Sequence, residues 1–213
     1  MRLSTASTED GKRTVDVRSL GIDLAGSEKR DTGLAVLDEG LTCWALTVRL
    51  DSEIIRLAED LKPDVVVIDA PLSLPRGRKS IEDRSGPHFR ACDIELRRIG
   101  IKFFPITLGP MRMLTSRGIN LSNRLSAMGL KVIESYPGGV QDILGIPRKR
   151  DLRGLVDGLK RLGLRGCPEK LNEHEADAAT IAYLGVLYMK GEAVGLGDPE
   201  EGLLFLPRFK NKI

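Results

Sequence analysis

Short apolar runs that each end in a carboxylate are the feature that most limits how this chain can fold. Unbroken apolar runs of this length are typical of strands buried on both faces, as in an α/β sheet. A buried, unpaired charge costs roughly 2 kcal/mol or more, so acids at these positions need a shared partner. The runs and their acids are residues 20–22 with Asp23, residues 65–68 with Asp69, and residues 131–133 with Glu134.

A fourth carboxylate, Asp177, lies on a late helical pattern. Ile181, Leu184 and Tyr188 follow it at i+4, i+7 and i+11, so Asp177 shares the apolar stripe that faces the sheet. Strand ends at the carboxyl edge of an α/β sheet are where ligands bind. We therefore expect the four acids to meet around divalent cations, the usual arrangement for chemistry on phosphate esters.

Each acid also has an ordinary alternative interpretation. A single Asp after a strand is commonly a turn or helix-cap residue, and Asp177 near a helix start can be satisfied by the free amides and the dipole. A lone histidine such as His174 is commonly a surface residue. These alternatives stay open for each position taken alone.

The periodicities predict an α/β fold with a mixed five-stranded sheet flanked by helices. The turn Asp38-Glu39-Gly40 between two β-rich runs predicts an antiparallel meander, and a helix before the fourth strand predicts a crossover to parallel pairing. Residues 71–130 form a helical, basic insertion after the fourth strand. The predicted strands are 17–23, 32–37, 41–50, 65–69 and 131–136, with a sixth, edge segment at 202–207. The predicted helices are 52–61, 89–99, 111–114, 119–128, 140–144, a helix after Arg153 that ends at Leu162, and 173–190.

Length and composition favour one domain over residues 1–213, with residues 1–16 frayed. Three cysteines without a tight pair argue against a disulfide framework and against a CxxC zinc site. No run approaches the ~20 apolar residues that span a bilayer, so we expect a soluble, cytoplasmic protein. Four Asn and one Gln are few, which is typical of proteins from thermophiles.

The net charge of +3 conceals a segregation along the chain. Residues 71–130 carry 11 basic and 4 acidic side chains, whereas residues 1–70 carry 9 and 14. A basic middle beside acidic segments that hold most of the carboxylates suits a metal site next to a polyanion channel. The alternative is that these basic side chains only solvate exposed helices.

The order of the elements resembles that of the ribonuclease H-like fold, whose nucleases hold two divalent ions with acids from the first strand, the fourth strand and a C-terminal helix. The motifs are similar to those of the family catalogued as domain of unknown function 429, described as predicted nucleases of this fold. They are Gly21-Ile22-Asp23-Leu24-Ala25-Gly26-Ser27, Thr32-Gly33-Leu34-Ala35, Ile68-Asp69-Ala70-Pro71-Leu72, Arg90-Ala91-Cys92-Asp93-Ile94-Glu95-Leu96, Glu134-Ser135-Tyr136-Pro137 and His174-Glu175-Ala176-Asp177-Ala178.

The resemblance implies a metal-dependent nuclease that uses two Mg²⁺ or Mn²⁺ ions. Asp23 would bridge the ions, and Asp69, Glu134 and Asp177 would complete their ligands. Glu173, His174 and Ser27 are expected next to these ligands. Low aromatic content, 4%, favours contacts to the nucleic-acid backbone over base stacking. The candidates for binding substrate are Arg76, Arg78, Lys79, Arg84, Arg90, Asp93 and Arg97.

Two other functions remain open. The loop Leu24-Ala25-Gly26-Ser27 after Asp23 also resembles the first phosphate loop of actin-like ATPases and sugar kinases, which need two such cores where this chain has room for one. A catalytically silent module that binds nucleic acid or protein is the second alternative, and Mn²⁺ would not stabilise it. DNA, RNA and smaller phosphate esters all remain possible substrates.

Overall fold

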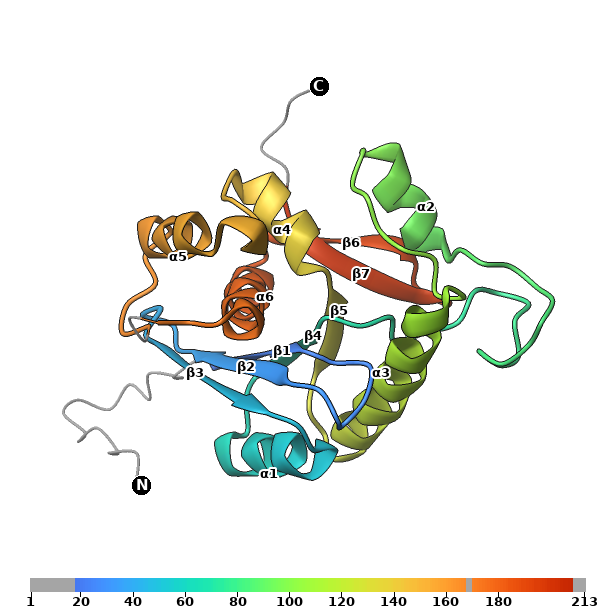
Figure 1. Ribbon diagram of the computed structural model, residues 1–213, viewed down its shortest axis with the longest axis horizontal. Helices are drawn as coiled ribbons and strands as arrows, with labels where there is room; N and C mark the ends of the chain where they lie inside the picture. Colours follow the sequence, from blue (N-terminus) through green and yellow to red (C-terminus); the bar gives the residue numbers. More distant parts are fainter. Residues whose placement is uncertain (1–17, 168–169, 209–213) are drawn as a thin grey trace.

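The computed structural model describes residues 18–167 and 170–208, whose strands form one mixed sheet in the order β3-β2-β1-β4-β5-β7-β6 (Figure 1). Strand β1 pairs antiparallel with β2 and parallel with β4, and β5 continues the parallel part. The expectation for residues 1–16 lies outside the described residues. The strands are β1 (Ser19–Asp23), β2 (Thr32–Leu37), β3 (Cys43–Val48), β4 (Val65–Ile68), β5 (Val132–Ser135), β6 (Ala193–Asp198) and β7 (Gly202–Pro207).

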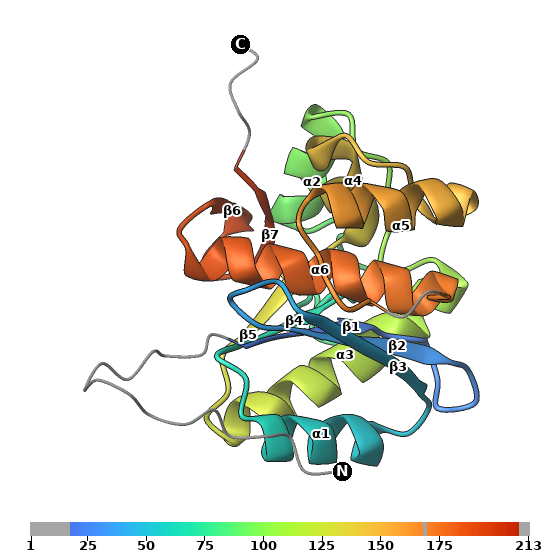
Figure 2. The same cartoon turned by 90° about the vertical axis from the view of Figure 1, so that its left-hand side faces the viewer.

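Helices cover both faces of the sheet. Helices α1 and α3 lie on one face, and α4, α5 and α6 lie on the other (Figure 2). No helix of residues 18–167 and 170–208 has both the length and the apolar character to cross a membrane. The helices are α1 (Asp51–Leu61), α2 (Ala91–Arg98), α3 (Gly109–Ala127), α4 (Pro137–Leu144), the 3-10 turn η1 (Lys149–Asp151), α5 (Leu152–Arg161) and α6 (Glu173–Met189).

The predicted fold class is confirmed: a mixed α/β sheet flanked by helices, with a helical insertion between β4 and β5. The sheet is wider than predicted, because β7 pairs with β5 and the unpredicted β6 adds to it as the edge strand. Helix α3 is continuous where two helices were predicted. Gly118 interrupts its apolar pattern, but the position is buried, and packing overrides the low helix propensity of glycine.

Helix α6 lies directly against the first two strands because two glycines leave room for its backbone. A Cβ atom on Gly21 would lie 2.2 Å from the carbonyl oxygen of Ala178, and one on Gly33 would lie 2.1 Å from that of His174. Gly33 is also the partner of Asp23 in the pairing of β1 with β2. The close packing therefore places the start of α6 beside the end of β1.

The start of α6 is fixed by the predicted capping box, which the structure confirms. The side chain of Asn172 accepts a hydrogen bond from the Glu175 amide (2.9 Å), and the Glu175 carboxylate accepts one from the Asn172 amide (3.0 Å). Thr47 of β3 joins both side chains, donating to Glu175 and accepting from Asn172. The beginning of α6 is thus tied to the sheet as well as capped.

Candidate active site

Three of the four predicted acids come together where α6 crosses the carboxyl ends of β1 and β4. Asp23 ends β1, and Asp69 directly follows β4, with its amide donating to the carbonyl of Ile22 (2.9 Å). Asp177 lies in the second turn of α6. The carboxyl of Asp69 interacts with those of both Asp23 and Asp177, and the latter two are only 6% and 3% exposed. The acids are near one another although they are distant in sequence.

Crowding and burial raise the pKa of two of these acids, Asp69 and Asp177. Burial, the negative charges of Asp23 and Asp177, and a hydrogen bond with Asp23 raise the pKa of Asp69 well above its usual value. Burial and the charge of Asp23 likewise raise the pKa of Asp177, although Lys149 and Gln141 oppose the rise. The cluster thus has a strong need for positive charge.

Two basic side chains supply part of that charge. His174 Nδ1 lies 2.7 Å from Asp23 Oδ2, and this hydrogen bond raises the pKa of His174. Lys149 Nζ lies 2.7 Å from Asp177 Oδ2, and its ion pair raises the pKa of Lys149 against the opposing effect of burial. Gln141 Nε2 donates to the other oxygen of Asp177 (2.8 Å).

Lys149 and Gln141 are site residues that the sequence analysis missed. Lys149 stands in a run of three basic residues, Arg148 to Arg150, in which no pattern distinguishes the middle one. Gln141 is the one glutamine of the chain and lies on α4, where it is buried. Its burial was not visible in the sequence, but an isolated amide within the apolar pattern of a short helix was a usable signal.

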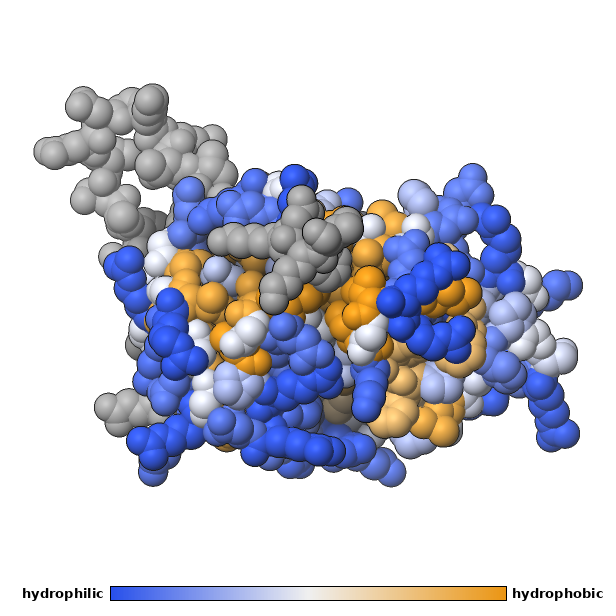
Figure 3. Space-filling model, turned by 90° about the horizontal axis from the view of Figure 1, so that it is seen from above, coloured by the Kyte–Doolittle hydropathy of each residue, from blue (hydrophilic) through white to orange (hydrophobic). Residues whose placement is uncertain are grey.

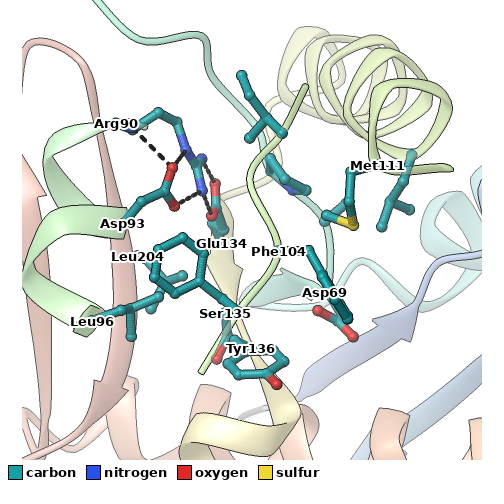
Figure 4. A pocket seen from close by; sticks show the side chains of 15 residues that line it. Asp69, Arg90, Asp93, Leu96, Phe104, Met111, Glu134, Ser135, Tyr136 and Leu204 are labelled. Carbon is teal, nitrogen blue, oxygen red and sulfur yellow. Dashed lines mark hydrogen bonds and ion pairs between the residues drawn. The ribbon is translucent and has the colours of Figure 1, made fainter. Parts of the chain in front are cut away.

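Glu134, the fourth predicted acid, is paired with Arg90. Its carboxylate accepts two parallel hydrogen bonds from the Arg90 guanidinium, both 2.7 Å, and a third from the Leu72 amide (2.8 Å). Asp93 binds the other side of the same guanidinium (2.9 Å) (Figure 4). Arg90, Asp93 and Glu134 are all at least nine-tenths buried. Glu134 therefore serves a buried ion-pair network beside the three aspartates.

Electrostatics within this network favour the charged form of Arg90. Burial alone lowers the pKa of Arg90, but the charge and hydrogen bonds of Glu134, with the charge of Asp93, raise it well above its usual value. The expectation that Arg90 holds substrate phosphates is corrected, since its Nε and both terminal nitrogens already donate to the carboxylates of Asp93 and Glu134. Asp93 is likewise a partner of Arg90.

The other basic candidates divide by exposure. Arg78 is buried and donates to the carbonyls of Ser80, Asp83, Gly86 and Pro87, so it organises its own loop, which corrects its assignment to phosphate binding. Arg76 is exposed but paired with Asp198, the last residue of β6, and with Glu200 in the turn that follows.

Lys79, Arg84 and Arg97 remain exposed, and Arg97 lies 5.2 Å from the ring centre of Phe89. Glu173 is exposed at the first residue of α6, and Ser27 is half-buried in the loop after β1. Neither Glu173 nor Ser27 makes a hydrogen bond or ion pair through its side chain within the described parts of the chain. The structure therefore leaves these five positions as predictions.

Arg117 of α3 positions the loop that follows Asp23. This buried guanidinium donates to the Ala25 carbonyl (2.8 Å), to the Arg49 carbonyl (2.8 Å) and to Asp51 at the start of α1 (2.9 Å). One side chain thus joins the insertion to the loop between β1 and β2. Sequence analysis did not identify Arg117, because the three segments it joins are far apart along the chain.

A cavity of about 160 Å³ lies beside the cluster. Asp69 is part of its wall, and the ion-pair network of Arg90, Asp93 and Glu134 forms another part (Figure 4). Aromatic and aliphatic side chains make up most of the rest. The carboxylate cluster and the buried ion-pair network thus border the same space.

The donors of the cluster fit a hard divalent cation in kind, because Mg²⁺ and Mn²⁺ prefer carboxylate oxygens. In the arrangement described for residues 18–167 and 170–208, however, no three His, Cys, Asp or Glu side chains are placed to hold one ion together. Lys149 and His174 occupy carboxylate oxygens that such an ion would use. Binding of a cation therefore requires local rearrangement.

Comparisons with known proteins found no matching family model and no matching curated protein. Among solved structures, the chain is similar to Thermus thermophilus RuvC in complex with a Holliday junction substrate, at 15% identity and a TM-score of 0.47, over 82% of this chain and 96% of that one. It is also similar to Thermus thermophilus RuvC alone, at 13% identity and a TM-score of 0.46, over 82% and 97%.

Proposed function

We propose that this chain is a divalent-metal-dependent nuclease that hydrolyses phosphodiester bonds of nucleic acid. The observation that carries the proposal is the convergence of Asp23, Asp69 and Asp177, with the pKa of Asp69 raised by burial and by its two neighbours. Titratable groups with strongly perturbed pKa values that cluster in a cleft are typical of catalytic sites. A structural role would not require three acids to share one place.

The three aspartates are the residues we assign to Mg²⁺ or Mn²⁺, whereas Glu134 is paired with Arg90. Bound ions of this kind activate water and stabilise the leaving oxygen during phosphodiester hydrolysis. Lys149 must leave Asp177 to free that carboxylate. Because Lys149 is 44% exposed in its side chain, it can swing toward solvent or toward a substrate phosphate.

His174 is placed to move a proton. Its Nδ1 is bound to Asp23, which leaves Nε2 to face a substrate. The raised pKa keeps more of the ring protonated near neutral pH, so His174 can donate a proton to the leaving oxygen. Asp23 would orient the ring in that role.

A cleavage assay tests the proposal. Labelled single-stranded, duplex and branched DNA and RNA are incubated with the protein in Mn²⁺, in Mg²⁺ and in EDTA. We expect cleavage with metal only, and Asp23→Asn and Asp177→Asn should each reduce it by 10³-fold or roughly so, the scale on which loss of a major electrostatic contact acts. Asp157→Asn, an exposed acid on α5, is the matched control and should keep full activity.

Mn²⁺ binding provides an independent measurement. At about 100 times its dissociation constant, a bound ion stabilises a protein by about 2.7 kcal/mol. We expect Mn²⁺ to raise the melting temperature of the wild type and of Asp157→Asn but not of Asp23→Asn. Absence of both cleavage and stabilisation in the wild type would favour the catalytically silent binding module.

A further inference from the structure

The cavity beside Asp69 has walls of a distinct chemistry. Phe103, Phe104, Met111 and Tyr136 supply aromatic and soft apolar surface, and the Arg90 network supplies a polar end. Figure 4 shows Phe104 and Met111 near Asp69, with Arg90 and Asp93 farther along the cavity. An apolar slot with one polar end is typical of a binding site for a flat, partly polar ring.

We propose that this cavity receives one unstacked cytosine base of a nucleic-acid substrate. The inference rests on the proposed function, because it places the base next to the acids assigned to the scissile phosphate. The cavity would give the protein a preference for one base at one position of an unpaired strand. The carboxylate cluster alone contains nothing that provides such a preference.

Size limits the ring that fits. A protein cavity of about 150 Å³ is known to accept benzene. The cavity here is of about 160 Å³, so it has room for one six-membered ring and little more. A pyrimidine fits this space, whereas the second ring of a purine would extend beyond it into the open side of the cavity.

The walls suit stacking. Phe103 is held by an edge-to-face contact with Phe89, at 6.0 Å between ring centres, so its orientation is fixed before any ligand arrives. Phe104 is 67% exposed, an unusual state for a phenylalanine with no partner ring among the described residues. A base in the cavity would cover part of it.

The surface seen from the side of α2 and α4 carries apolar areas between hydrophilic rims (Figure 3). Phe104 follows α2 in the chain, and Ile99 at the end of α2 is also exposed. The exposed apolar side chains in this part of the molecule therefore extend beyond the cavity itself, along the segment that leads from α2 to α3.

The polar end selects for a hydrogen-bond donor. Arg90 contributes one positive charge and Asp93 and Glu134 contribute two negative ones, so the network carries a net charge of −1 and disfavours phosphate. Glu134 Oε1 accepts one hydrogen bond, from Arg90, among the described residues, and a carboxylate oxygen has about two lone-pair sites. It can therefore accept a second donor.

Cytosine offers that donor through its exocyclic amine, whereas thymine and uracil offer only the N3–H, which lies between two carbonyl oxygens. The exocyclic amine of cytosine is a good partner for Glu or Asp, whereas thymine places a carbonyl oxygen at the same position. A carbonyl there would face a net negative network. Because the cavity admits only an unstacked base, the substrate strand must be single-stranded or locally opened, since a paired base loses its pairing and stacking before it can enter.

Binding of two oligonucleotides tests the proposal. One probe is a fluorescein-labelled 15-residue oligothymidylate, and the other carries a single central cytosine. Fluorescence anisotropy is measured with the full chain in Ca²⁺, which supports binding with little cleavage. We expect the cytosine probe to bind about fivefold or more tightly, the discrimination of a specific base contact.

Phe104→Ala should remove that difference, because it deletes one wall, and the side chain is exposed enough for the fold to tolerate its loss. Trp44→Ala, a second exposed aromatic on β3 and outside the cavity, is the matched control and should keep the difference. Tight binding of both probes without a preference in the wild type would overturn the cytosine site while leaving the nuclease proposal intact.

A second measurement decides the case in which neither oligonucleotide binds. Cytidine and thymidine are titrated separately into protein labelled with ¹³C in its methionine methyl groups. We expect cytidine to shift the signal of Met111, assigned with Met111→Leu, while the signal of exposed Met113 stays unchanged. Equal shifts from both nucleosides, or none from either, would overturn the cytosine site even if the protein proves to be a nuclease.

Discussion

His174 Nδ1 lies 2.7 Å from Asp23 Oδ2, so a residue of the last helix completes the environment of an acid on the first strand. This contact depends on the close packing of α6 against β1 and β2. It couples the protonation of the histidine to the stability of the fold as well as to the proposed chemistry.

The first prediction concerns pH. The pKa of His174 is raised in the folded protein, so its stabilising contribution is full below the usual value of 6.5 and is lost as the pH rises through the higher folded value. In EDTA, His174→Gln should lower the free energy of unfolding more at pH 5.5 than at pH 8.5. The effect should not exceed about 1 kcal/mol, because the side chain is 42% exposed.

Urea unfolding at the two pH values measures this difference. His88→Gln is the matched control, because His88 is the other histidine of the chain and contacts Thr107 far from the cluster in sequence. The control should retain the wild-type pH dependence. Equal losses from His174→Gln at both pH values would exclude the protonated histidine as a source of stability.

The second prediction is that Asp69→Asn stabilises the metal-free protein at pH 8. Burial and two neighbouring acids raise the pKa of Asp69, so its cost to stability builds up as the pH rises from the usual value of 3.8, is full above the raised pKa, and becomes smaller as the pH falls. We expect a gain of about 0.5 kcal/mol or more, outside the scatter of ordinary surface substitutions. Thermal unfolding in EDTA at pH 8 and at pH 5 tests this, and Asp157→Asn should show no such change.

The third prediction separates the two roles considered for Glu134. Removing one partner of a buried ion pair is strongly destabilising. Because Glu134 is paired with buried Arg90, Glu134→Gln should lower the free energy of unfolding by about 3 kcal/mol. If Glu134 instead belonged to the crowded acids, its removal would leave the metal-free protein equally stable or more so. Glu173→Gln, at an exposed acid of α6, is the control and should remain within about 0.5 kcal/mol of the wild type.

The fourth prediction concerns the packing of α6 against the sheet. Gly33→Ala would place a Cβ atom 2.1 Å from the backbone oxygen of His174, so the helix must shift. We expect a loss of about 1 to 3 kcal/mol in the free energy of unfolding, and a loss of cleavage activity that exceeds the loss of folded protein. Gly109→Ala, whose Cβ would meet no atom within 4 Å, should change neither.

The fifth prediction concerns the basic loop between β4 and α2. Lys79 and Arg84 are exposed cations of this loop that make no ion pair in the described parts of the chain, unlike Arg76. If the loop contacts phosphates, the double variant Lys79→Glu/Arg84→Glu should bind nucleic acid with a weaker salt dependence. The slope of log K, with K the association constant, against the logarithm of the salt concentration should become smaller by about 2. Arg56→Glu with Lys62→Glu, at exposed positions of α1 and its end, is the control. Equal slopes for both double variants would remove this loop from the proposed nucleic-acid surface.

Local signals in the sequence were sufficient for most of the fold. The apolar runs at 65–68 and 131–133, the capping residues Asn172 and Glu175, and the turn at 38–40 act over a few residues, and the structure has the corresponding elements. The partners of β7 were not predictable in the same way. Pairing between strands depends on long-range contacts, and β6, with glycines at 195 and 197, gives a weak strand pattern.

The same distinction between local signals and long-range contacts applies to the candidate site. The positions of Asp23, Asp69 and Asp177 at strand and helix ends follow from periodicity and from the rule that carboxyl ends of parallel strands share an edge. The pairing of Glu134 with Arg90 does not, because it depends on Arg90 reaching β5 from the start of α2, 44 residues away in sequence. The ion pair between Lys149 and Asp177 likewise joins segments that are distant in sequence.

The sequence by itself determined which residues carry charge at the ends of buried elements. Only the tertiary structure decided which opposite charge each of them meets. The physical reason is that a buried charge is stabilised by whatever donor or cation the packing brings within hydrogen-bond distance. That distance depends on how α2, α4 and α6 dock on the sheet, and no local pattern encodes it.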